Sequence, residues 1–125
     1  MRHNVPTGQV WVSTVATTML DLADDLRRGG GVSNVATVLL ELSDEVDLDP
    51  QVLAETAAQF PLSAMRRLGY LLDLIGQREM AEPLHVLCEH RRHVRADVLA
   101  ASAARSGIVD SRWRIDVNTD VEPDL

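Results

Sequence analysis

The side chains most able to do chemistry gather in the stretch 85–93, which also holds the single cysteine of the chain. Residues three or four positions apart share one face of a helix. Zinc takes three or four convergent ligands, and no second cluster in the sequence supplies the ligands that this helix cannot provide. We therefore favour an exposed basic helix face over a metal site, and predict no cofactor; a small metal-dependent enzyme is the third hypothesis. The candidate ligands are His85, Cys88, Glu89, His90 and His93.

Motifs for nucleophilic or phosphate chemistry are absent from the sequence. Cys88 has apolar neighbours in a predicted helix, where a thiol is inert. The glycines at 29–31 lack the Gly-Lys-Ser/Thr continuation of a phosphate-binding loop, and they are typical of a helix stop. No Gly-x-Ser-x-Gly elbow is present. We predict no catalytic residues and a protein that is not an enzyme.

Arginine supplies all 12 basic side chains, and most of them lie in the second half of the chain. If the predicted fourth and fifth helices pack antiparallel, these side chains form one positive surface suited to bidentate contacts. The competing interpretation pairs each arginine with a local acid, Arg66 with Asp73 and Arg114 with Asp116. Exposed pairs of this kind contribute on the order of 0–1 kcal/mol. The candidates for partner binding are Arg66, Arg67, Tyr70, Arg91, Arg92, Arg95, Arg112 and Arg114.

Hydrophobic periodicity and turn residues place the elements that carry these side chains. A candidate strand at residues 10–12 precedes a first helix, capped by Ser13 or Thr14 and stopped by the glycines at 29–31. Ser33 is predicted to cap a second helix. Asp49 followed by Pro50 predicts the start of a third.

The second half of the chain is predicted to hold two more helices and a strand. The fourth helix opens at Ser63 and ends at Gly76, with Leu71 and Leu74 widening its buried face. The fifth begins near Glu82-Pro83. Residues 96–104 form either a short strand at 98–99 or a continued helix, and the alternating residues 113–117 predict a strand. The fold class is α+β, predominantly helical, with about five helices and a small sheet formed by short N- and C-terminal strands.

Gly69 interrupts the most helix-like segment of the chain. Glycine inside a helix costs about 1 kcal/mol relative to alanine, so its position at the edge of the buried face needs a reason. A missing side chain lets another segment come close. We expect the strand of Trp113 or the fifth helix to cross at this point, so that Gly69→Leu destabilises the fold.

Length and charge restrict the class of protein. The 125 residues fit one domain, 1–125. The net charge of −7 is concentrated in residues 20–60, with nine acids and two arginines, and in the tail 116–125, with four acids. This acidity argues against non-specific nucleic-acid binding. One cysteine, no signal peptide and no membrane-length apolar run predict a cytoplasmic protein without a membrane partner.

Two segments, FPLSAMRRLGYLLDLIG and RWRIDVNTDVEPDL, together resemble the C-terminal domain of AbiEi-type antitoxins from AbiE-like (type IV) toxin–antitoxin systems. The upstream VSTVATTMLDLADDLRRGGGVSNVATVLLEL is similar to that domain's opening, so the resemblance spans residues 10–125. We interpret most of the matching positions as determinants of the fold, and expect Asn118 to close a turn through its side chain.

The resemblance implies an antitoxin that neutralises a nucleotidyltransferase-like toxin of the AbiEii type and takes part in autoregulation of the operon. In the family this domain follows a winged helix DNA-binding domain, which we expect to be absent because helical signals begin at Ser13. The acidic residues 20–60, or the acidic tail, would mimic nucleic acid or nucleotide phosphates in a basic toxin cleft. The alternative is a transcriptional regulator module that aids promoter binding through the arginine patch, with DNA a partner only if the chain is fused or paired with a DNA-binding domain.

Overall fold

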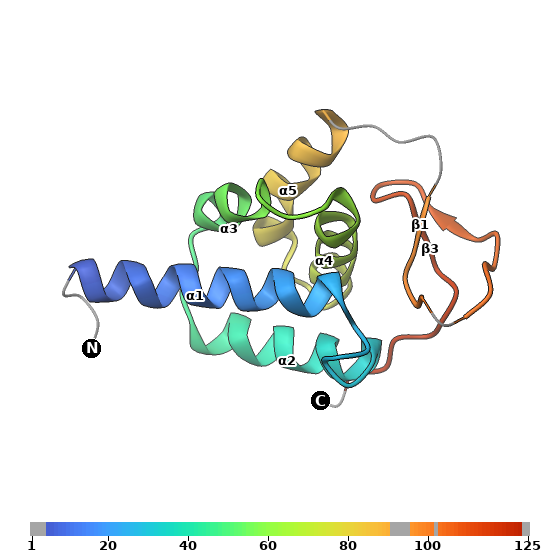
Figure 1. Ribbon diagram of the computed structural model, residues 1–125, viewed down its shortest axis with the longest axis horizontal. Coiled ribbons are helices and arrows are strands. Elements are labelled where there is room, and N and C mark those ends of the chain that lie inside the picture. The colour runs from blue at the N-terminus through green and yellow to red at the C-terminus, as the bar shows by residue number, and fades with distance from the viewer. Residues whose placement is uncertain (1–4, 91–95, 102, 124–125) are drawn as a thin grey trace.

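The computed structural model describes residues 5–90, 96–101 and 103–123, with the backbone alone for residues 5–13. Helices dominate this part of the chain, and a small sheet follows them (Figure 1), as the predicted α+β class requires. The helices are α1 (Val5–Asp24), α2 (Val32–Glu45), α3 (Pro50–Ala57), α4 (Leu62–Leu74) and α5 (Arg78–His90). The strands are β1 (Asp97–Val98), β2 (Val109–Asp110) and β3 (Ile115–Asp116).

The expected N-terminal strand is wrong, because residues 10–12 lie inside α1. The β-branched composition of these residues is only a weak preference, and their backbone continues the 20-residue helix α1. Because α1 begins at Val5, neither Ser13 nor Thr14 caps it. Every described strand therefore comes from the chain after α5.

The caps of the next two helices differ from each other. The N-cap of α2 is Gly31, with φ 97° and no side-chain cap, so the predicted capping role of Ser33 is wrong. The Ser33 hydroxyl instead accepts the backbone N–H of Glu122 at 2.9 Å and ties the C-terminal segment to α2. The prediction for α3 is confirmed: Asp49 Oδ1 accepts the Gln51 N–H at 2.9 Å.

Helix α4 begins at Leu62, one residue before the predicted start, and ends where expected. Gly76 has φ 86°, and the N–H of Gln77 donates to the Leu72 carbonyl at 2.8 Å. This left-handed glycine closes the helix in a Schellman arrangement.

Helix α5 begins at Arg78, so the predicted start near Glu82-Pro83 is wrong and Pro83 lies inside the helix. The Ala81 N–H already donates to the Gln77 carbonyl at 3.2 Å, which forms the first turn before the proline. A proline so near the start of a helix removes a single backbone hydrogen bond.

Helix α4 lies at the centre of the core and contacts α1, α2, α5 and β3. Its residues Met65, Leu68, Leu71 and Leu72 are fully buried. Leu74, predicted to widen this face, is 47% exposed, because at helical spacing it lies on the side of α4 that carries the partly buried Arg67 and Tyr70. Among the described residues no helix is both long and apolar enough to cross a membrane.

The sheet has the order β1-β3-β2, with β1 parallel and β2 antiparallel to the central β3. The strand alternative for residues 96–104 is therefore the correct one. The predicted strand 113–117 shortens to Ile115–Asp116, because Arg114 adopts a left-handed backbone with φ 53°. The adjacent residues Ile115 and Asp116, which regular alternation would place on opposite faces, are both buried.

We predict that Asp49→Ala lowers the free energy of unfolding by about 1 kcal/mol, because the N-cap acceptor of α3 is lost. Urea unfolding followed by circular dichroism measures this. Asp47→Ala is the matched control, since Asp47 is also exposed and lies two residues away outside the helix. Equal stability of the two variants would contradict a capping role for Asp49.

Candidate functional site

The residues that sequence reasoning singled out meet where α4 receives the segment after α5. We call residues 96–118 the C-terminal unit; it contains the three strands and the turn that carries Trp113. One face of α4, read at helical spacing, presents Arg66, Gly69 and Asp73 to this unit. The contacts below show that this face is a joint inside the molecule.

Gly69 receives the indole ring of Trp113. A Cβ atom placed on Gly69 would lie 2.1 Å from Cζ3 and 2.2 Å from Cη2 of that ring. Real Cβ atoms do not approach other atoms so closely, and Trp113 is only 1% exposed. Of the two crossings expected at Gly69, by the segment of Trp113 or by the fifth helix, the structure shows the first.

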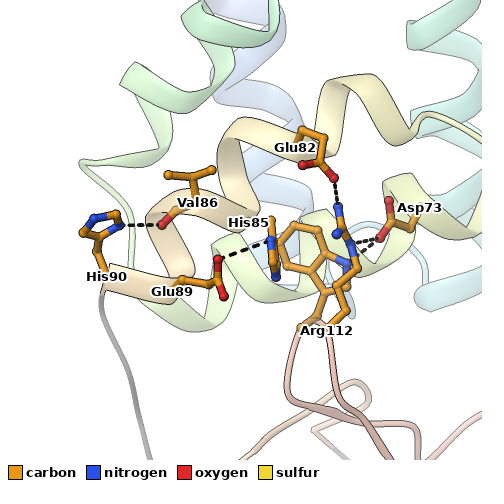
Figure 2. A network of polar contacts seen from close by, with 8 residues as sticks. Asp73, Glu82, His85, Val86, Glu89, His90 and Arg112 are labelled. Carbon is orange, nitrogen blue, oxygen red and sulfur yellow. Dashed lines mark hydrogen bonds and ion pairs between the residues drawn. The ribbon is translucent and has the colours of Figure 1, made fainter.

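Asp73 holds the polar edge of the same indole (Figure 2). Its Oδ2 accepts the Trp113 Nε1–H at 2.6 Å and the Arg112 Nε–H at 2.7 Å. The other end of the Arg112 guanidinium donates to Glu82 of α5. The Arg112 Cζ also lies 5.3 Å from the centroid of the Trp113 ring, within the range of a cation–π contact. One turn of the C-terminal unit is therefore bound to both α4 and α5.

Arg66 and Arg67 hold strand β1 on the other side of Gly69. The side chain of Arg66 is 2% exposed, and its Nη1 lies 3.2 Å from Asp97 Oδ2. Arg67 Nε donates to the Val98 carbonyl at 2.9 Å, and its Nη1 reaches the Asp24 carbonyl of α1 at 3.4 Å. The ion pair that Arg66 forms is thus with Asp97 of β1, whereas the local-pair interpretation predicts one with Asp73.

Asp116 organises the loop between β1 and β2. It is 2% exposed and accepts the Ser106 N–H at 2.9 Å, the Ser106 hydroxyl at 2.7 Å and the Gly107 N–H at 3.2 Å. The two bonds from Ser106, with a smaller effect from Gly107 and the charge of Arg105, lower the pKa of the carboxyl. The expected position beside Arg114 on a solvent face is wrong, because strand alternation breaks at Arg114.

Asn118 closes the first part of the same loop. Its Oδ1 accepts the Ala100 N–H at 2.8 Å, and its Nδ2 donates to the carbonyls of Ala100 at 2.8 Å and Ala103 at 3.2 Å. The predicted turn-closing role is confirmed. Sequence reasoning missed the similar role of Asp116; the exposed Ser106-Gly107 turn nine residues before it was the available signal.

The contacts of the joint and burial also shift the pKa of two further groups, Glu82 and Tyr70. The hydrogen bond from Arg112, together with its charge, lowers the pKa of Glu82. Burial, with a smaller effect from the negative charge of Asp110, raises the pKa of Tyr70. Tyr70 is half-buried, so its hydroxyl stays protonated at neutral pH.

The eight candidates for partner binding are thus placed differently. Arg66, Arg67 and Arg112 make contacts within the molecule, Tyr70 is half-buried, and Arg114 is exposed. The other three, Arg91, Arg92 and Arg95, lie outside the described residues. A partner contact by any of the eight stays a prediction.

The histidine-rich stretch is used for packing where it is described. His85 meets Trp113 edge to face, with ring centroids 5.3 Å apart, and its Nδ1 lies 3.8 Å from Glu89 Oε1. His90 Nδ1 is 2.8 Å from the Val86 carbonyl (Figure 2). Cys88 is buried, and His93 lies outside the described residues. Within the described part of the chain, no three His, Cys, Asp or Glu residues converge to hold a metal ion.

The acids of residues 20–60 lie at the surface, in contrast to Arg66, Arg67 and Arg112, which make contacts within the molecule. All nine are exposed, and the ion pairs found among the described residues include none of them. Several close the ends of helices: Asp24 is the last residue of α1, and Asp44 and Glu45 are the last two of α2. The full set is Asp21, Asp24, Asp25, Glu41, Asp44, Glu45, Asp47, Asp49 and Glu55.

In a comparison with protein families, residues 2–74 match the model described as AbiEi antitoxin C-terminal domain. This region runs through α1–α4 and ends at the last residue of α4. It includes the first of the two resembling segments up to Leu74, and the second lies beyond it. Comparison with curated proteins and with solved structures gives no match.

We predict that Gly69→Ala lowers the free energy of unfolding by about 3 kcal/mol, because the new methyl group overlaps the Trp113 ring. At an unconstrained helix position the same change is stabilising by up to about 1 kcal/mol, so the sign itself is informative. Urea unfolding of the wild type, Gly69→Ala, Trp113→Leu and the double variant measures the coupling between the two positions. The joint requires the Gly69→Ala penalty to shrink when the indole is removed; an unchanged penalty would contradict the contact.

We predict that Asp116→Asn lowers stability at pH 7 and flattens its dependence on acid pH. The folded protein holds this carboxyl with a lowered pKa, so its contribution is complete above the unfolded value of about 3.9 and is lost as the pH falls below it. Thermal unfolding between pH 7 and pH 2 measures the slope. Asp120→Asn, at an exposed site, is the control; parallel curves for wild type and Asp116→Asn would refute the role of the carboxylate.

Proposed function

Because the chain belongs to the AbiEi antitoxin C-terminal domain family, we propose that it is an antitoxin domain that neutralises a nucleotidyltransferase-like toxin of the AbiEii type by direct contact in the cytoplasm. It acts by binding, without catalysis of its own. The surface that binds the toxin is formed by the exposed acids of α1, α2 and the start of α3.

The observation that supports this surface is where its acids lie. Asp44 and Glu45 end α2, and Asp21 and Asp24 lie in the last turn of α1. The C-terminus of a helix carries partial negative charge, so each acid there costs about 0.3–1 kcal/mol. Neither helix has a basic residue in its last turn. The fold thus keeps acids where they oppose its stability, which favours a role in binding.

A nucleotidyltransferase must hold nucleotide phosphates, and a cleft that does so is basic. Because these carboxylates are exposed and none takes part in an ion pair in the described structure, they can meet such a cleft without first breaking an ion pair. Complementary charge raises the rate of association and selects the partner. The proposed mode of neutralisation is therefore occupation of the phosphate-binding cleft by acids that stand in for phosphate groups.

The alternative role in promoter binding has less support. It relied on the arginine patch, but Arg66, Arg67 and Arg112 are engaged inside the molecule. The net charge of −7 also opposes contact with a phosphate backbone. Autoregulation of the operon accordingly stays in the proposal only with a DNA-binding domain fused to this chain or paired with it.

We predict that Asp44→Asn with Glu45→Gln weakens toxin binding at least tenfold at low ionic strength while leaving the melting temperature unchanged or higher. The binding loss follows from the removed charges, and the stability gain from relief of the unfavourable dipole contact. Co-expression with the toxin of the same operon and a growth assay measure neutralisation. Calorimetric titration at two salt concentrations measures the affinity.

The matched control is Asp120→Asn with Glu122→Gln, which removes two exposed charges from the tail. If only this tail variant loses affinity, the tail is the mimic and the helical acids are not. If both variants still neutralise the toxin, charge mimicry is excluded although the antitoxin role stands. Failure of the wild-type chain to restore growth would overturn the antitoxin role itself.

A further inference from the structure

We draw no further inference here: the strongest candidate, the outer edge of strand β2 with the exposed side chains of Ile108 and Val109, carries none because nothing in the described structure shows what covers it.

Discussion

The insertion of one indole ring into the notch left by one glycine is the contact on which the rest of the structure depends. Trp113 is the largest fully buried side chain among the described residues, in a chain where aromatic residues make up only 3%. Its ring lies on Gly69 while its N–H donates to Asp73. Because Gly69 and Asp73 lie one turn apart on α4, this single side chain fixes both the distance and the rotation of the C-terminal unit against the helices. Arg66, Arg67 and Arg112 make the remaining contacts of the joint. These contacts add to an interface whose register the indole defines.

A second feature is that basic and acidic side chains lie in different places: several arginines make contacts within the molecule, and the acids of residues 20–60 are exposed. Arg66, Arg67 and Arg112 are directed into the joint. There a planar guanidinium can bind two elements at once: Arg67 donates to carbonyls of β1 and α1, and Arg112 donates to carboxylates of α4 and α5. The acids of α1 and α2 are directed to solvent, and Asp21, Asp24, Asp44 and Glu45 lie in the last turns of these helices, where the helix dipole disfavours negative charge. In the proposed function, these exposed acids contact the toxin, whereas Arg66, Arg67 and Arg112 make contacts within the molecule. An antitoxin domain that stands in for phosphate groups would use its charges in this way.

Sequence reasoning succeeded where a physical conflict was visible in the residues themselves. A glycine inside an apolar helix carries a local cost that only a close contact explains, and this led to the crossing at Gly69. Asp49-Pro50 and Gly76 each act within one turn of chain, so their roles as helix start and helix stop could be read directly. The reasoning failed where a local preference competed with packing: residues 10–12 are helical, α5 starts before Pro83, and Ser33 binds the distant Glu122.

By itself the sequence determined the helical class of the protein, the acidic exposed face and the presence of a close contact at Gly69, because each depends on spacing or charge along a continuous stretch of chain. Only the tertiary structure decided which arginine meets which acid, and the reason is distance along the chain. Arg66 and Asp97 lie 31 positions apart, Arg112 and Asp73 lie 39 apart, and no helical or strand period connects them. The same holds for Asp116, whose burial follows from a backbone break at Arg114. Three members of the candidate positive surface, Arg66, Arg67 and Arg112, thus lie in the joint between α4 and the C-terminal unit.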